Sequence, residues 1–316
     1  MTGIAHIPDT YRTAIRAWIM MARIPFHSVG VLPFCLGAML AWRTTGTFNW
    51  PVFLWATLAV VLIMLSTYLA GEFSDLEEDR LSAQMERNRF TGGSQAVVQG
   101  LVPRHHPRVG SYVALALAGA IGVLLQFGYH TGPWTIPLGM TGMLFGFFYS
   151  TEPLRWVKRG IGEIIIGFSY GWLPIAVSFY LQTGHFSPLV HWMSLPVALS
   201  IFNVILINEF PDHPADLRQG KKNLTVRFGK KTASLVYAAA SLAGVLLSPL
   251  AVTAGLSPNS LIFLLPVAVL SILAAMGMLT GKHADRAVLE KMCGLTIAVN
   301  LLYAAAYMAS LMVWGL

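Results

Sequence analysis

Two short windows of this 316-residue sequence place carboxylates at the same spacing. The first reads Gly-Glu-Phe-Ser-Asp-Leu-Glu-Glu-Asp (71–79), and the second reads Asn-Glu-Phe-Pro-Asp-His-Pro-Ala-Asp (208–216). Both follow the pattern E-F-x-D-x-x-x-D, and equivalent positions lie 137 residues apart, as 72 and 209 do. We interpret the pair as a parallel internal repeat that arose by duplication, with each copy supplying half of one site.

The spacing within the first copy predicts a metal site. Positions i, i+3 and i+7 of a helix fall within about 60° of one another, so Glu72, Asp75 and Asp79 should share a face, while Glu77 and Glu78 should point into solvent. Carboxylates this close repel one another unless a cation holds them. Mg²⁺ binds through a few carboxylates and keeps waters and substrate phosphate oxygens as its other ligands. The predicted Mg²⁺ ligands are Glu72, Asp75, Asp79, Asp212 and Asp216, and the four aspartates among them are the predicted catalytic residues.

In the second copy, Pro211 and Pro214 favour an irregular segment over a helix that continues through 216. An acidic, solvated loop is the alternative explanation for either window alone. Two matching windows beside apolar stretches favour a shared site.

Basic residues follow both acidic windows. Lys and Arg beside metal-bound carboxylates are what a diphosphate leaving group requires, because negative charge builds on it as its bond breaks. Each basic residue alone could instead anchor the chain at a membrane surface. Together they predict diphosphate binding by Arg87, Arg89, Lys158, Arg159, Lys221 and Lys222.

The composition predicts a membrane protein. Hydrophobic residues make up 55% of the chain, charged residues 11%, and the mean hydropathy is +0.63, whereas soluble domains carry about 25% charged residues. Apolar stretches of about 20 residues, the length that crosses a bilayer, predict an all-α bundle of nine transmembrane helices around a central cavity. Their expected ranges are 24–42, 52–72, 109–127, 134–150, 161–181, 193–210, 232–252, 259–279 and 288–313.

The basic residues also predict an orientation. Of the 21 Lys and Arg residues, all but Arg43 fall on one side of these nine spans, and an excess of Lys and Arg marks the cytoplasmic side. We therefore expect one domain over 1–316 in the cell (inner) membrane, with its N-terminus and its motif loops, about 73–108 and 209–231, in the cytoplasm. The partner of the basic residues is then the lipid bilayer and not nucleic acid. The first dozen residues lack the features of a removable signal peptide, and Cys35 and Cys293 should be free thiols.

At these residues the sequence resembles the UbiA superfamily of intramembrane prenyltransferases, whose motifs are NDxxDxxxD and DxxxD. Asn208, Asp212 and Asp216 match the second motif, and the resemblance adds Asn208 to the diphosphate ligands. In the first motif Asp75 and Asp79 match, but Gly71-Glu72 stands where the family has Asn-Asp. The resemblance implies a helical bundle that binds an isoprenyl diphosphate between the two motifs through Mg²⁺. Ionisation would give an allylic cation in an apolar cavity, which an electron-rich aromatic acceptor attacks.

Two further stretches resemble the branch of the family that makes menaquinone. They are 88–101, which begins Asn-Arg-Phe-Thr-Gly-Gly-Ser-Gln, and 149–163. This resemblance implies that the acceptor is 1,4-dihydroxy-2-naphthoate, whose prenylation is accompanied by decarboxylation.

Four residues are weaker candidates for the cavity or the acceptor. Phe145 and Tyr149 could line a cavity that shields a carbocation from water. Glu163 lies just inside an apolar stretch and either pairs with Arg155 or Arg159 or contacts the acceptor. Asn203 faces either the cavity or a neighbouring helix.

Other functions share part of this pattern. The same cation chemistry could serve an ether lipid, a porphyrin or chlorin acceptor, or the substrate's own double bond in a terpene cyclase. A transporter is a different class, and parallel repeats occur there. Transporter coupling sites usually lie near the membrane midplane, whereas these acids lie at one edge.

Overall fold

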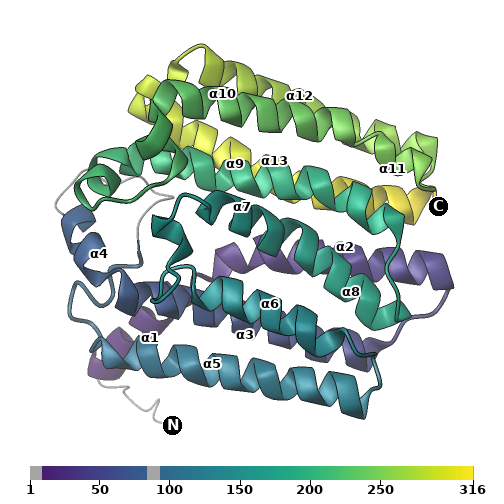
Figure 1. The fold of residues 1–316 in the computed structure, drawn as a ribbon, viewed down its shortest axis with the longest axis horizontal. Helices are drawn as coiled ribbons and strands as arrows, with labels where there is room; N and C mark the ends of the chain where they lie inside the picture. The colour runs from purple at the N-terminus through teal and green to yellow at the C-terminus, as the bar shows by residue number, and fades with distance from the viewer. Residues whose placement is uncertain (1–8, 84–92, 316) are drawn as a thin grey trace, which may run out of the picture.

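The computed structural model describes residues 9–83 and 93–315, and every regular element in those ranges is a helix (Figure 1). A π-helical turn extends α5 (η2, Leu124–Gly128), and another joins α7 to α8 (η4, Phe168–Trp172). The α-helices are α1 (Asp9–Ala22), α2 (Ser28–Thr45), α3 (Trp50–Ser74), α4 (Leu76–Ala83), α5 (His105–Val123), α6 (Thr135–Phe147), α7 (Gly162–Gly167), α8 (Leu173–Thr183), α9 (Pro188–Arg218), α10 (Leu224–Leu247), α11 (Leu250–Thr253), α12 (Leu261–Leu279) and α13 (Arg286–Val313).

Eight helical stretches of the described chain are long and apolar enough to cross a membrane. They are Thr13–Thr45, Trp50–Ser74, His105–Gly128, Gly162–Thr183, Pro188–Arg218, Leu224–Thr253, Pro258–Leu279 and Arg286–Val313. The remaining predicted span, 134–150, corresponds to α6, which is apolar but has 13 residues. At about 1.5 Å per residue it is shorter than the roughly 30 Å of a bilayer's hydrocarbon core.

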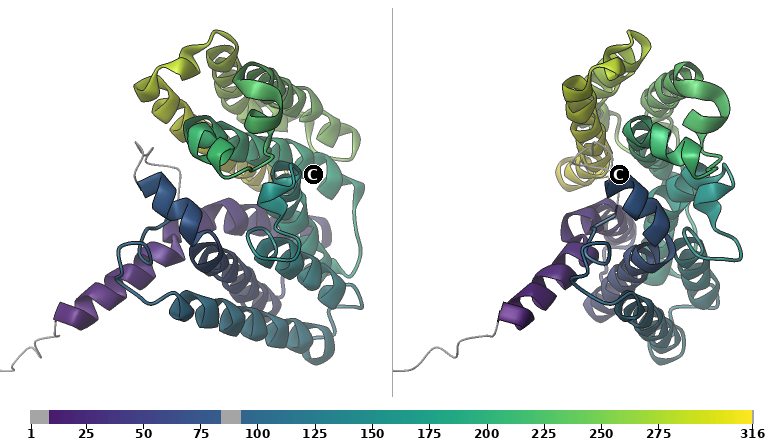
Figure 2. Two further views of the ribbon diagram at one scale, coloured as in Figure 1. Left: turned by 60° about the vertical axis from the view of Figure 1, so that its left-hand side comes forward. Right: turned by 90° about the vertical axis from the view of Figure 1, so that its left-hand side faces the viewer.

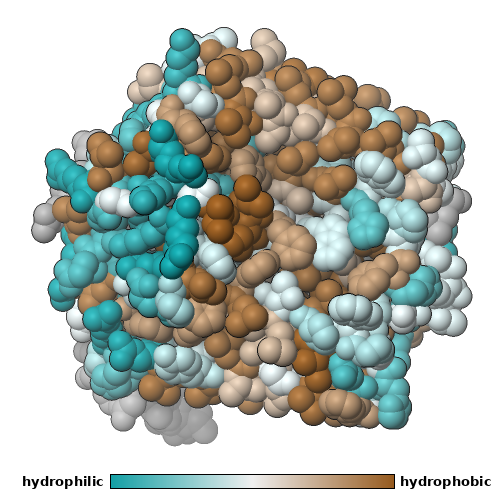
Figure 3. All heavy atoms as spheres, viewed as in Figure 1, coloured by the Kyte–Doolittle hydropathy of each residue, from teal (hydrophilic) through white to brown (hydrophobic). Residues whose placement is uncertain are grey.

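The outer surface of the bundle is apolar, as contact with lipid requires. More than half of each side chain is exposed at Val109, Val113 and Leu117 on α5, and at Ile262 and Leu265 on α12. Figure 3 shows this hydrophobic surface across the middle of the molecule, with hydrophilic side chains gathered at the left.

The helices run alternately between two ends of the bundle (Figure 1). At the left-hand end α3 and α9 finish and α7 and α10 begin; we call it the motif end, because both acidic windows lie there. The N-terminal helix α1 is also at the motif end and extends away from the bundle, whereas the C-terminus lies at the opposite end (Figures 1 and 2).

Glycine allows the helices to approach closely at two points in the core. A Cβ atom on Gly37 of α2 would lie 2.2 Å from the backbone oxygen of Ile175 in α8. A Cβ atom on Gly171 would lie 2.3 Å from the Cα atom of Ala198 in α9. These contacts hold α2 and α9 against the segment that begins with α7, which carries Glu163.

The helix that carries the second acidic window is longer than the sequence predicted. α9 continues to Arg218 with Pro211 and Pro214 inside it, so the prediction of an irregular segment was wrong. Each proline removes one backbone donor, but its fixed φ is compatible with a helix. Contacts across to the start of α10 hold this last part of α9. Glu209 accepts a hydrogen bond from the Thr225 N–H (3.1 Å), and Asp216 accepts one from the side-chain amide of Asn223 (2.7 Å).

The packing of α2 on α8 can be tested with Gly37→Ala. The added methyl group meets backbone that cannot rotate away, so we expect the free energy of unfolding to fall by about 1–3 kcal/mol. The melting temperature of the detergent-purified protein measures this loss. Gly122→Ala is the control, because a Cβ atom there meets nothing within 4 Å. Equal melting temperatures for the two variants would contradict the close contact.

Candidate active site

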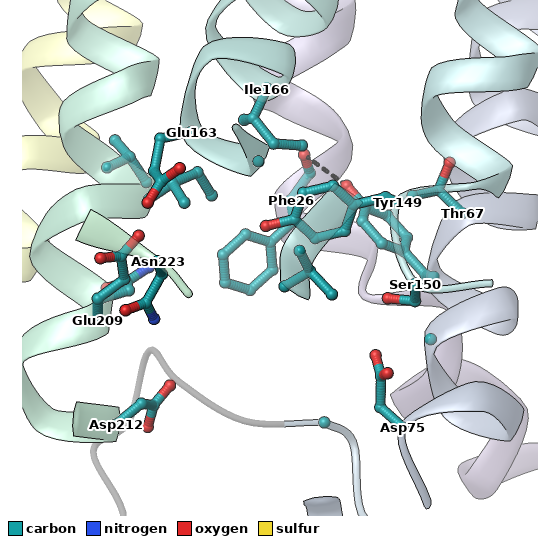
Figure 4. Close-up of a pocket in the computed structure, with 18 of the residues that line it drawn as sticks. Phe26, Thr67, Asp75, Tyr149, Ser150, Glu163, Ile166, Glu209, Asp212 and Asn223 are labelled. Atoms are coloured by element: carbon teal, nitrogen blue, oxygen red, sulfur yellow. Dashed lines mark hydrogen bonds between the residues drawn. The ribbon is translucent and has the colours of Figure 1, made fainter. Parts of the chain in front are cut away.

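The motif end contains a cavity of about 310 Å³ that both acidic windows line. Figure 4 shows Asp75 and Asp212 on opposite sides of it, with Glu163, Glu209 and Asn223 on the same side as Asp212. Its polar part is strongly acidic, with eight carboxyl groups: Glu72, Asp75, Glu78, Asp79, Glu163, Glu209, Asp212 and Asp216. Arg23 and Lys221 are the basic residues of its described wall.

The first acidic window does not form one continuous helix. α3 ends at Ser74, Asp75 has non-helical backbone angles (φ −98°, ψ 18°), and α4 begins at Leu76. Because of this break, Glu78 turns toward the cavity and is only 8% exposed. The prediction that Glu78 points into solvent was therefore wrong. Glu77 does face solvent, where it pairs with Arg80 (2.8 Å).

Glu78 is the centre of an ion-pair network. Its carboxylate lies 2.7 Å from Arg155 and 2.7 Å from Lys158, and it also faces Lys221 (3.5 Å). Arg155 extends the network to Asp75 (2.9 Å), and Lys221 extends it to Asp216 (2.9 Å). Lys221 therefore connects the first acidic window to the second.

Glu72 and Asp79 hold the segment that returns to the bundle after residue 92. Ser94 donates to Glu72 through its backbone N–H (2.8 Å) and through its hydroxyl (2.7 Å). The Gly93 N–H donates to Asp79 (3.1 Å). A Cβ atom at Gly93 would lie 2.1 Å from an Asp79 carboxylate oxygen, so only glycine allows this approach.

The second acidic window makes contacts of the same kind. Glu209 accepts a hydrogen bond from Thr225, and Asp216 accepts one from Asn223. Thr225 and Asn223 come after the second window in the chain, just as Ser94 and Gly93 come after the first. In both copies, the glutamate accepts from a backbone N–H of the returning segment and the last aspartate accepts from a neighbouring residue. Asn208 also lines the cavity, and its amide oxygen is buried without a hydrogen-bond partner among the described residues.

Burial and mutual repulsion perturb the carboxyl groups at the membrane edge. Burial, and then the neighbouring Glu78, raise the pKa of Asp75. Burial, followed by Glu72 and Asp75, raises the pKa of Asp79 to about 7. Burial lowers the pKa of Lys221, but Asp216, Glu78 and Asp75 raise it further, so that it lies above its ordinary value. This excess of negative charge would be relieved by a bound cation.

The donor atoms around the cavity fit Mg²⁺. Carboxylate and amide oxygens are hard ligands of the kind that Mg²⁺ prefers, and the buried Asn208 oxygen accepts no hydrogen bond from the described residues. In the described residues, no group of three or more His, Cys, Asp or Glu side chains is arranged to hold a metal ion alone. Mg²⁺ often takes only one or two carboxylates from the protein and completes its shell with phosphate oxygens and water. The arrangement therefore suits an ion that enters together with a phosphate-containing substrate.

Most of the predicted site residues lie at this cavity. Besides the acids, Asn208, Lys221 and Tyr149 line it, and Lys158 reaches it through Glu78. Lys222 is exposed and does not line it, and Arg159 binds the backbone oxygens of Pro153 and Leu154. Arg87 and Arg89 lie outside the described residues.

The four weaker candidates also include residues that line the cavity and residues that do not. Glu163 lines the cavity; within the described chain it forms no ion pair with Arg155 or Arg159, and it accepts a hydrogen bond from the Leu224 N–H (2.8 Å). Phe145 and Asn203 do not line it. Phe145 packs edge-on against Trp156 and Phe168. Asn203 donates to the Tyr237 carbonyl (3.0 Å) and to Ser241 (2.9 Å) on α10, so it faces the neighbouring helix.

Three charged residues of the network or the cavity wall were not predicted from the sequence. Arg23 reaches the cavity from a left-handed backbone conformation (φ 47°), which no spacing rule predicts. The inward position of Glu78 depends on the helix break at Asp75, which the sequence pattern did not predict. Arg155 lies in the basic stretch 149–160, but it could not be distinguished there from Lys158 and Arg159 by sequence alone.

Comparison with known proteins identifies the family. The model of the UbiA prenyltransferase family matches residues 31–300, which is most of the chain. The chain belongs to the UbiA prenyltransferase family. It is a transferase of prenyl groups and a multi-pass integral membrane protein.

Several relatives in this family have named activities. A 2-carboxy-1,4-naphthoquinone phytyltransferase of Synechocystis is 28% identical over 72% of this chain and 71% of its own length. A 1,4-dihydroxy-2-naphthoate octaprenyltransferase of Bacillus subtilis is 25% identical over the same shares. The bacteriochlorophyll synthase 33 kDa chain of Rhodobacter capsulatus is 27% identical over 40% of this chain and 42% of its own.

Solved structures show the same fold. A UbiA homologue from Aeropyrum pernix superimposes with a TM-score of 0.68 at 20% identity, over 90% of this chain and 97% of that one. A UbiA homologue from Archaeoglobus fulgidus, bound to DMAPP and Mg²⁺, gives a TM-score of 0.64 at 15% identity, over 92% of this chain and 99% of that one.

The charge network can be tested by comparing Glu78→Gln with Glu77→Gln. Neutralising Glu78 removes the carboxylate that pairs with Lys158 and the link between Arg155 and Lys221. We therefore expect the free energy of unfolding to fall by about 1–3 kcal/mol. Glu77 is exposed, so its variant should melt within error of the wild type. Melting temperatures of both purified variants measure the difference. A Glu78→Gln variant as stable as the Glu77→Gln variant would contradict the network.

Proposed function

We propose that this enzyme transfers a polyprenyl group from an isoprenyl diphosphate to an aromatic acceptor, with Mg²⁺ as its cofactor. The observation that carries the proposal is the convergence of two acidic windows on one cavity, with Lys221 joined to both. Opposed carboxylates with a cation between them suit a diphosphate that metal ions bridge. The named relatives and the homologue bound to DMAPP and Mg²⁺ support the same chemistry.

Each polar residue then has a proposed role. Asp75, Asp79, Asp212 and Asp216 hold Mg²⁺, which when bound neutralises the charge that develops on the diphosphate. Lys221, Lys158 and Asn208 bind the diphosphate, as do Arg87 and Arg89, and Arg23 and Arg155 join them. Arg159 and Lys222 lie farther out, where they attract the incoming anion. Because both oxygens of Glu72 accept from Ser94, we propose that Glu72 positions this segment beside Asp79 in place of the expected direct metal contact.

The other half of the cavity is apolar and suits the prenyl chain. Phe26, Val29, Ile166, Ile201 and Val204 line it, together with the rings of Tyr68, Tyr149 and Tyr170. Such a wall excludes water, which would otherwise capture an allylic cation, and the aromatic faces stabilise positive charge. Glu163 lies where the polar and apolar halves meet, so we propose that it contacts the acceptor.

The acceptor that we favour is 1,4-dihydroxy-2-naphthoate, which would place the enzyme in menaquinone synthesis. The two naphthoate-type relatives cover about 72% of this chain, whereas two bacteriochlorophyll synthase chains cover 40% and 59%. That match makes a chlorin the second candidate acceptor.

We further propose nine membrane crossings, a parallel repeat and a cytoplasmic motif end. α6 would be the short ninth crossing. An odd number of crossings agrees with the positions of the two terminal segments, because α1 lies at the motif end and the C-terminus lies at the opposite end (Figure 1). The matched contacts of the two acidic windows support the repeat, and the concentration of Lys and Arg at the motif end supports its cytoplasmic placement.

A product assay tests the proposed reaction. Purified enzyme is incubated with a labelled prenyl diphosphate and either dihydroxynaphthoate, a chlorin or no acceptor, with Mg²⁺ or with EDTA. We expect a prenylated naphthoquinol with Mg²⁺ and dihydroxynaphthoate, and at least a hundredfold loss in Asp212→Asn, as is typical when charge stabilisation of a leaving group is removed. A labelled hydrocarbon formed without acceptor would identify a cyclase instead, and full turnover in EDTA would contradict the metal mechanism.

A further inference from the structure

A second cavity of about 80 Å³ lies beside the first and shares two wall residues with it, Thr67 and Tyr170. It lies between α2, α3, α6 and the η4–α8 segment, and we call it the side cavity. Its wall includes Ile63, Leu138, Leu173 and Val177. In Figure 4, Thr67 is on the opposite side of the main cavity from Glu163 and Glu209. The side cavity therefore extends the apolar half of the main cavity on the side away from the second acidic window, along α3.

Glycines on one face of α6 leave this space open. Gly139, Gly142 and Gly146 follow the spacing i, i+3 and i+7, and all three line the side cavity. Close packing explains Gly146, because a Cβ atom there would lie 2.3 Å from the Thr67 hydroxyl. It does not explain the other two. A Cβ atom at Gly139 meets nothing within 4 Å, and one at Gly142 makes ordinary contact with Leu173 at 3.5 Å.

These two glycines are unfavourable for the helix itself. Glycine inside a helix costs about 0.5–1 kcal/mol relative to alanine. At Gly139 and Gly142 no neighbouring atom excludes a Cβ atom, so what the glycines provide is the open volume. An apolar group that fills an apolar space of this kind is stabilised by van der Waals contacts with the wall.

The chemistry of the wall identifies the kind of group that fits. None of the described residues that line the side cavity is charged. Thr67 donates its hydroxyl proton to the Ile63 carbonyl (3.0 Å). Only the Ser169 hydroxyl is buried there without a partner among the described residues. One hydroxyl cannot satisfy an acceptor with several polar groups, so the wall suits a hydrocarbon.

We propose that the side cavity binds distal isoprene units of the prenyl chain, and that Gly139 and Gly142 determine how long a chain the enzyme accepts. The proposal rests on the prenyl transfer proposed above. With the diphosphate between the acidic windows, the chain runs through the apolar half of the main cavity, passes between Thr67 and Tyr170, and ends against α6.

Leucine substitutions test this assignment. In Gly139→Leu and Gly142→Leu the new side chain fills the side cavity. We expect kcat/KM to fall at least tenfold for geranylgeranyl and octaprenyl diphosphate but to stay within about twofold for dimethylallyl diphosphate. Gly139→Ala, which adds one methyl group, should give an intermediate loss and serves if a leucine variant does not fold. Gly122→Leu on α5 is the matched control, since a Cβ atom there also meets nothing within 4 Å and the residue lines neither cavity.

Each other outcome overturns a specific statement. Equal losses for short and long diphosphates, or no loss for either, would show that the chain does not enter the side cavity. A raised KM for the acceptor alone would assign the side cavity to the acceptor. Absence of turnover by the wild type with every diphosphate would overturn the proposed function, and this inference with it, whereas the first three outcomes leave prenyl transfer intact.

Discussion

The ion pairs of Lys221 with Asp216 and Glu78 are the interaction on which the motif end depends. They connect two segments that are 137 residues apart in the sequence and lie on opposite sides of the cavity. A buried carboxylate is stable only when it is paired or protonated, and this cavity gathers eight carboxyl groups at the edge of an apolar bundle. Arg155, Lys158 and Lys221 balance part of this charge, and the remaining negative charge is what makes the cavity a binding site for cations.

The same balance explains how the chain is arranged around the site. Apart from Arg43, the Asp, Glu, Lys and Arg residues of the described chain lie toward the motif end, where water and lipid headgroups can solvate those that are not paired, while the rest of the bundle is held by apolar packing. Glu72 and Glu209 are buried, and each accepts from a backbone N–H of a returning segment. In this way the acidic windows shape their own surroundings as well as supplying candidate metal ligands. Beyond them the cavity becomes apolar, so a substrate with a charged head and a hydrocarbon tail matches both halves.

Much of the fold and of the site could be predicted from the sequence. Apolar runs show where helices cross a membrane, because the hydrocarbon core demands a minimum length. The repeated spacing of Asp75, Asp79, Asp212 and Asp216 predicted one shared site, and all four line the same cavity although the first window is broken at Asp75. Predictions were wrong where they depended on a break within a helix or on the backbone conformation at a proline. The break at Asp75 turns Glu78 inward, and α9 continues through Pro211 because contacts with the start of α10 hold it. The neighbours of Asn203 and Phe145 depend on helix packing, which no single helix encodes.

In the proposed mechanism the two acidic windows bind metal and diphosphate together. Mn²⁺ can replace Mg²⁺ as a paramagnetic probe, and its binding can be followed by electron paramagnetic resonance in the presence of an unreactive geranyl thiolodiphosphate. We expect Mn²⁺ to bind tightly only when the analogue is present, and we expect Asp75→Asn and Asp212→Asn each to weaken this binding. Tight Mn²⁺ binding that needs no analogue, or that survives either substitution unchanged, would contradict it.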